Sequence, residues 1–214
     1  MKADGTILAR KFIDFASDKD RMIHAMNRTR RKQSKYGPKS ARGLWAYVKR
    51  LNEDRAKKIS AAIVEFASQH SVDAIVIEHL DFKGCKKRGS KAQRLSMWNH
   101  GIIREKVEQK AHLLGIRIAT ICAWKTSALA FDGSGSVTRD DNNHALATFT
   151  TGKQYNCDLS ASYNIGARYF IRELLKSLPA TEESRVKAKV PDVGRRTSCT
   201  LSTLRMLVKE LSAA

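Results

Sequence analysis

Apolar residues recur at the three- and four-residue intervals of an amphipathic helix in several stretches of the chain. The predicted helices cover residues 17–36, 44–69, 96–114, 156–178 and 201–211. Two shorter apolar-rich runs, at 74–77 and 116–122, contain β-branched residues and predict strands, the first of them buried on both faces. Because helices alternate with strands in this order, the sequence predicts an α/β fold.

The start of the chain carries a weaker strand pattern. Residues 5–15 alternate apolar and polar side chains, which predicts a strand that opens at the Asp4-Gly5 turn. Ser17 and Asp20 have the spacing of a capping box, so the first helix is expected to begin there. The Gly37-Pro38 pair is expected to end that helix.

The sequence predicts a single domain over residues 1–214. Two stretches of it depart from the helical and strand periodicity. Residues 124–155 are rich in glycine and polar side chains, and they are interpreted as an inserted loop or small subdomain. Residues 180–214 form a basic C-terminal tail, expected to be loosely ordered over 181–198. The aromatic residues, Trp98 and Trp124 among them, are expected to be core residues more often than base-stacking ones.

The charge balance indicates the kind of partner that the chain binds. Forty Lys and Arg against 21 Asp and Glu leave a net charge of +19, which favours nucleic acid or another polyanion. With 42% hydrophobic residues the chain is expected to fold, and no apolar run approaches the roughly 20 residues of a membrane span. We therefore expect a cytoplasmic protein with no membrane partner. The four cysteines form no CxxC pair, so no zinc is expected.

The basic residues gather in two places. One group lies in the first predicted helix and the other in the loop after the strand at 74–77. The predicted nucleic-acid-binding residues are Arg28, Arg30, Arg31, Lys32, Lys35, Lys83, Lys86, Lys87 and Arg88. A phosphate-tracking surface and an ordinary solvated face both remain open for them.

Two carboxylates occupy positions where metal ligands are found. Glu78 comes directly after the apolar run at 74–77, at the strand end where open α/β sheets carry their chemistry. Asp158 falls in the first turn of the helix at 156–178. Hard divalent cations bind carboxylate oxygens, and such ions activate water for phosphodiester cleavage. From the residues alone, a solvated strand-end glutamate and a first-turn acid stabilised by the helix dipole remain alternatives.

Two segments resemble a known family. AIVIEHLDFKG at 74–84 and NCDLSASYNIGARYF at 156–170 are similar to the second and third RuvC motifs of the TnpB family, which are transposon-encoded, RNA-guided nucleases related to type V CRISPR effectors. Shorter likenesses at 4–12, 123–127 and 145–155 extend the resemblance over nearly the whole chain. It implies an RNase H-like (RuvC) mixed sheet flanked by helices and a Mg²⁺-dependent DNA endonuclease site. The catalytic and metal-binding residues that it implies are Glu78 and Asp158.

The chain also departs from that family. Its nuclease site uses three acids, and the first lies on a strand before the position where this sequence starts, so we expect a sheet that lacks its first two strands. Two acids should bind Mg²⁺ weakly or not at all, which predicts a chain that is inactive alone. A partner chain is one source of the missing strands, and guide RNA is expected to bind through the absent N-terminal region.

The family's zinc finger should follow Thr126-Ser127, yet residues 128–135 contain no cysteine, so residues 124–155 are interpreted as a degenerate form of it. Two alternatives to the nuclease stay open. One is a nuclease-dead nucleic-acid-binding regulator, and the other is a decayed gene fragment.

Overall fold

The computed structural model describes residues 1–80, 97–194 and 197–213. The chain divides into two compact units. The first comprises Met1–Arg10, Val76–Asp81 and Ala119–Ala214, and the second comprises Lys11–Ile75 and Phe82–Ile118. Among the described residues, no helix has the length and apolar character needed to cross a bilayer.

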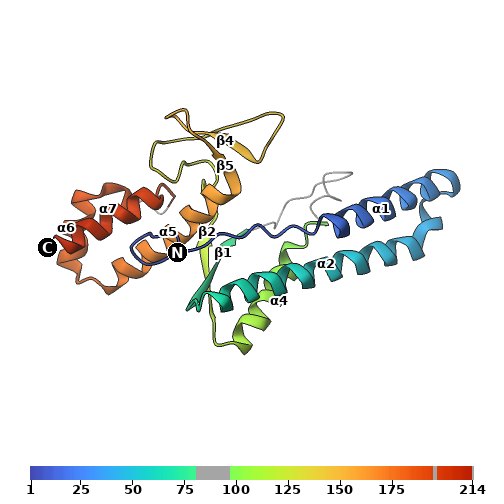
Figure 1. Ribbon diagram of the computed structural model, residues 1–214, viewed down its shortest axis with the longest axis horizontal. Coiled ribbons are helices and arrows are strands. Elements are labelled where there is room, and N and C mark those ends of the chain that lie inside the picture. The colour runs from blue at the N-terminus through green and yellow to red at the C-terminus, as the bar shows by residue number, and fades with distance from the viewer. Residues whose placement is uncertain (81–96, 195–196, 214) are drawn as a thin grey trace. The chain divides into compact units, whose positions relative to one another are not determined.

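A helical hairpin dominates the second unit (Figure 1). Helix α1 (Ala16–Tyr36) and helix α2 (Arg42–Gln69) are joined by the short 3₁₀ helix η1 (Pro38–Ala41). The predicted end of the first helix is confirmed, since Gly37 follows α1 with a φ of 87°. The predicted capping box is wrong. Helix α1 begins at Ala16, so Ser17 lies within the helix, and no side chain caps its N-terminus.

Small side chains form the buried face of α2. Its buried residues are Val48, Asn52, Ala56, Ser60, Val64 and Ala67. Helix α4 (His100–Leu113) packs on α2 and buries Val107 and Ala111. The hydroxyl of Ser60 donates to Ala56 O at 2.6 Å and contacts Ile103 O at 3.3 Å. The larger apolar residues Leu51, Ile59 and Ile63 flank this seam and are half-buried.

Strand β1 (Ala74–His79) pairs with strand β2 (Arg117–Cys122). The amide of Arg117 donates to Asp73 O at 3.0 Å, which places the starts of the two strands side by side. The predicted strands are thus confirmed, but β1 is half-buried rather than buried on both faces. In the described residues β1 pairs only with β2, so its other edge is not covered by a strand.

The predicted strand at 5–15 is wrong. The turn at Gly5 is present, with a φ of 81° and a hydrogen bond from its amide to Lys2 O at 3.0 Å. Residues 7–14 are nevertheless not a strand, and within the described part of the chain their backbone forms no hydrogen bond. Apolar alternation alone cannot form a strand without a partner for the backbone amides and carbonyls.

Three helices build the core of the first unit. They are α5 (Cys157–Ser177), α6 (Ala180–Lys189) and α7 (Leu201–Ser212), with α6 followed by the 3₁₀ helix η2 (Pro191–Gly194). The expectation of loose order over 181–198 is wrong for the part described. Val186, Val190 and Val193 are buried in the same core as Leu204 and Leu207. These valines recur at helical intervals, but they stand among charged residues, so the apolar pattern is weak in the sequence.

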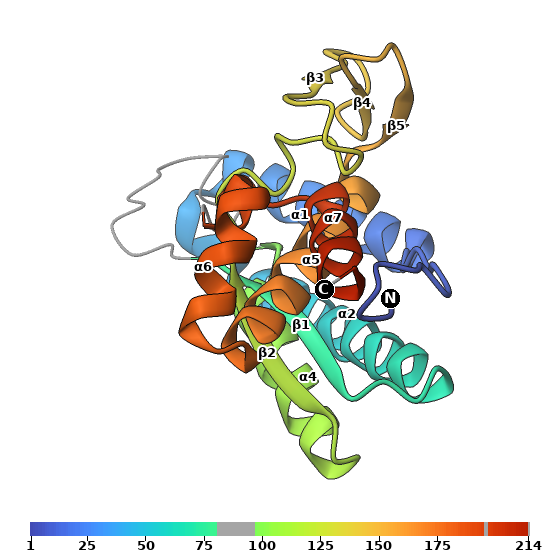
Figure 2. The same ribbon diagram turned by 90° about the vertical axis from the view of Figure 1, so that its left-hand side faces the viewer.

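The inserted stretch forms a small antiparallel sheet of β3 (Thr138–Arg139), β4 (Leu146–Thr148) and β5 (Gln154–Asn156) (Figure 2). Phe131 holds this sheet to α5, because its ring packs edge-on against Phe149 and Tyr163, with centroid distances of 5.6 and 5.3 Å. Burial, together with a hydrogen bond to Tyr155, raises the pKa of Tyr163 to about 12.

Replacing Leu204 tests whether the C-terminal segment belongs to the core. Its side chain is fully buried, so Leu204→Ala should lower the free energy of unfolding by about 2–5 kcal/mol. Met206, two residues along the same helix, is 51% exposed. Met206→Ala should therefore change the free energy of unfolding by about 0.5 kcal/mol or less. Urea unfolding followed by circular dichroism measures both. Equal, small effects would show that α7 does not stabilise the unit.

Candidate functional site

Glu78 lies near the end of β1 and is half-buried. The hydroxyl of Thr126, in the loop after β2, donates a hydrogen bond to Glu78 Oε1 at 2.5 Å. Among the described residues Glu78 has no ion pair, although the chain carries an excess of cations. No residue in the described ranges donates to its second carboxylate oxygen.

Asp158 lies in the first turn of α5, as predicted, and is exposed. Asn156, two residues earlier, caps the helix, since its side chain accepts the amide of Leu159 at 2.9 Å. Asp158 forms no hydrogen bond or ion pair within the described ranges. Its carboxylate thus points from a fixed helix end without a competing partner.

The loop after β2 contacts Glu78 and the residue beside Asp158. Glu78 accepts from Thr126, and the thiol of Cys157, the residue beside Asp158, lies 3.5 Å from Ser127 O. The dipeptide Thr126-Ser127 is therefore in contact with the strand that carries Glu78 and with the helix start that carries Asp158.

A buried amide fixes this loop to α5. Asn164 is fully buried, and its Nδ2 donates to Thr126 O at 3.0 Å and to Leu129 O at 2.9 Å. Its Oδ1 accepts the amide of Leu201 at 3.2 Å. Both amide protons and the carbonyl oxygen are used, so this side chain ties the loop and the start of α7 to α5.

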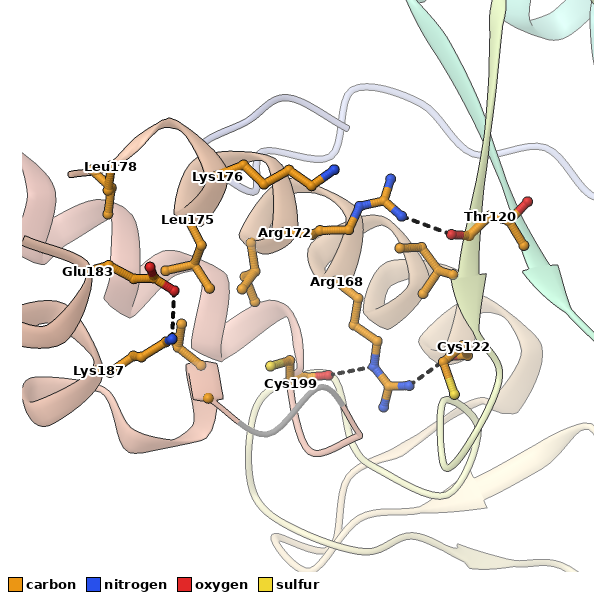
Figure 3. Close-up of a pocket in the computed structure, with 14 residues that line it drawn as sticks. Thr120, Cys122, Arg168, Arg172, Leu175, Lys176, Leu178, Glu183, Lys187 and Cys199 are labelled. Atoms are coloured by element: carbon orange, nitrogen blue, oxygen red, sulfur yellow. Dashed lines mark hydrogen bonds and ion pairs between the residues drawn. The ribbon is translucent and has the colours of Figure 1, made fainter. Parts of the chain in front are cut away.

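One turn further along α5, Arg168 holds the other end of the loop (Figure 3). Its guanidinium is 5% exposed and donates to the carbonyls of Cys122, Trp124, Thr197 and Cys199, at 2.8 to 3.1 Å. Burial lowers the pKa of Arg168, and the nearby thiols and Glu78 oppose that shift.

A cavity of about 560 Å³ lies beside β2 and α5 (Figure 3). Arg172 reaches across it to donate to Thr120 O at 3.0 Å, and it also pairs with Glu173 at 2.9 Å. Lys187, on α6, pairs with Glu183 at 2.6 Å. The cations that line this cavity are thus already engaged by acids and carbonyls.

The basic residues predicted to bind nucleic acid lie partly on the second half of α1. Arg28, Arg30, Arg31, Lys32 and Lys35 are all exposed there. Of these, Arg28, Arg31 and Lys35 recur at intervals of three and four and so share one side of the helix. Lys83, Lys86, Lys87 and Arg88 lie outside the described residues.

Sequence reasoning missed the residues that organise this loop. Thr126 belonged to a short resemblance at 123–127, and Asn164 and Arg168 lie within the motif at 156–170, but none received a role. The sequence did contain a signal for them, namely a polar residue on the core-facing side of a predicted helix, because buried polar groups need hydrogen-bond partners. The expectation that the tryptophans are core is wrong for Trp98 and Trp124, which are 50% and 64% exposed.

Comparison with known proteins adds one finding. No family model matches the chain, and no curated protein does. Among solved structures, the chain matches one from the cryo-EM structure of the Cas12f1-sgRNA-target DNA complex, with a TM-score of 0.55. The chain shares its fold with part of Cas12f1. The match covers 74% of this chain and 44% of the other, at 18% identity, so the likeness concerns the fold alone.

Asn164→Asp tests the clamp on the loop. A carboxylate cannot donate to Thr126 O and Leu129 O, so we expect destabilisation of about 3–5 kcal/mol at neutral pH, partly relieved in acid where the group is protonated. Asn27→Asp, at an exposed position on α1, is the matched control and should be near neutral. Unfolding midpoints of both variants at several pH values measure these effects. A neutral effect of Asn164→Asp would contradict the clamp.

Proposed function

We propose that this chain is a RuvC-like nuclease domain of the TnpB type, whose role is RNA-guided cleavage of DNA with Mg²⁺ bound by Glu78 and Asp158, and that the chain alone is inactive or nearly so. The observation that carries the proposal is that one clamped loop contacts both Glu78 and the helix start that carries Asp158, and neither acid has an ion pair among the described residues. The shared fold with Cas12f1, whose solved complex contains an sgRNA and a target DNA, supports nucleic acid as the partner. The net charge of +19 supports the same conclusion.

The donor set fits a hard divalent cation. Each acid offers carboxylate oxygen, the ligand that Mg²⁺ prefers, and neither is neutralised by a cation among the described residues. The described ranges contain no group of three His, Cys, Asp or Glu residues arranged to hold a metal. Two protein ligands, with water and substrate phosphate completing the shell, therefore imply weak binding of Mg²⁺.

The chain's own residues have separate tasks in this reaction. Bound Mg²⁺ would supply an activated water and stabilise the leaving oxygen. Thr126 orients the Glu78 carboxylate, while the helix start at Asn156 fixes the backbone of Asp158. Asn164 keeps the loop against α5, so the two acids keep their places as substrate binds.

Replacing each acid tests the metal site. Glu78→Gln and Asp158→Asn should each weaken Mn²⁺ binding about tenfold or more, because each removes a charged ligand. Asp141→Asn changes the same net charge at an exposed acid of the insertion and should leave binding unchanged. Electron paramagnetic resonance of free Mn²⁺ measures binding.

Cleavage of labelled single-stranded DNA in Mg²⁺ is the second readout. The chain alone should cut slowly at most, and Glu78→Gln should abolish any cutting. Unchanged Mn²⁺ binding in both acid variants would contradict the metal site, and rapid cutting by the chain alone would contradict the expectation of weak activity.

A non-catalytic nucleic-acid-binding protein is a second proposal, favoured by the stripe on α1. Arg28 and Arg31 form no ion pair with a described residue, and Lys35 contacts only the ring of Tyr36, at 5.1 Å. Arg28 and Lys35 are seven residue steps apart on the helix, which makes this stripe about 10 Å long. Unpaired cations in a row are suited to neutralise backbone phosphates.

Removing the stripe tests whether α1 binds nucleic acid. In Arg28→Gln/Arg31→Gln/Lys35→Gln, the salt dependence of RNA binding should lose a slope of about 2, because two to three phosphate contacts disappear. The control is Arg185→Gln/Lys187→Gln/Lys189→Gln, whose cations already pair with glutamates. Fluorescence anisotropy with labelled RNA and DNA gives the slopes. Equal losses in both triple variants would show an effect of net charge alone.

A further inference from the structure

The Thr126 hydroxyl has one proton and two nearby acceptors. Glu78 Oε1 lies at 2.5 Å and Ala123 O at 3.0 Å from its oxygen. An ionised carboxylate is a stronger acceptor than a neutral carbonyl, so the proton points to Glu78. Thr126 is 2% exposed, and bulk water therefore cannot replace this donor.

The position of that hydroxyl is set by buried contacts. Asn164 binds the backbone carbonyl of Thr126 at 3.0 Å, and Arg168 binds Trp124 O, two residues earlier, at 2.8 Å. Both side chains come from α5 and are buried. Thr126 therefore holds Glu78 Oε1 at a place that the core defines, rather than following the glutamate as it moves.

We infer that Thr126 is a positioning residue that holds one oxygen of Glu78 in a hydrogen bond and thereby favours Mg²⁺ over Ca²⁺ at this carboxylate. The inference rests on the proposed metal site. A carboxylate oxygen that accepts a hydrogen bond is a weaker metal ligand than its free neighbour, so the hydrogen bond favours binding through the second oxygen. Mg²⁺ requires near-octahedral geometry with single-oxygen ligands and water, whereas Ca²⁺ tolerates a carboxylate that binds through both oxygens.

The test compares Mg²⁺ and Ca²⁺ binding at Glu78 itself. The full chain is labelled with ¹³C at glutamate side-chain carboxyls, and Glu78→Gln identifies the Glu78 resonance. Thr126→Val removes the hydroxyl at nearly constant shape. It should shift that resonance without metal, lower Mg²⁺ affinity about tenfold, and lower Ca²⁺ affinity less. Thr126→Ser should restore the wild-type preference, and Ser162→Ala, which removes an exposed hydroxyl on α5, should retain it.

The outcomes separate the inference from the function on which it rests. A reduced Mg²⁺ to Ca²⁺ preference in Thr126→Val, restored by serine, supports the inference. Equal loss of both affinities would assign Thr126 a merely structural role and overturn it, as would an unchanged preference. If neither ion moves the Glu78 resonance in the wild type, the proposed metal site fails. Thr126→Ala provides a second removal of the hydroxyl should valine prevent folding, and urea unfolding checks each variant.

Discussion

The buried amide of Asn164 is the interaction on which the candidate site depends. It donates to two carbonyls of the loop after β2 and accepts an amide at the start of α7, so it joins three segments that are distant in sequence. Since Asn164, Thr126 and Leu201 are buried, losing the amide would leave the carbonyl of Thr126 and the amide of Leu201 unpaired. The loop that contacts Glu78 and the residue beside Asp158 therefore cannot move independently of α5.

Polar clamps of this kind favour one geometry over many. An apolar side chain at Asn164 or Arg168 would pack with less dependence on direction, whereas a hydrogen-bonded network holds only when every partner is in place. Arg168 donates to four carbonyls in two separate segments, which fixes the loop and the approach to α7 together. The core around Leu204 provides the apolar burial, whereas Asn164 and Arg168 fix where the bound segments lie along α5.

The sequence predicted the elements better than it predicted their contacts. Periodicity located α1, α2, α4, α5, α7 and both strands of the first sheet, because burial of one helix face or strand run leaves a local pattern. It failed for residues 7–14, where strand formation depends on a partner, and for Val186, whose burial depends on α7. Asp158 was placed by a local rule, but Thr126 contacts Glu78 across 48 residues, and no local pattern encodes that contact.

The charge distribution bears on the metal site more directly than the motifs do. Most acids near a cation in this chain form ion pairs, such as Glu183 with Lys187 and Glu210 with Lys189. A cation held against Glu78 would compete with Mg²⁺ for the same oxygen and repel the ion. In its place the structure sets a neutral hydroxyl, which orients the carboxylate without cancelling its charge. An oriented carboxylate with no ion pair among the described residues, in a strongly basic chain, supports the proposed role of Glu78 as a metal ligand.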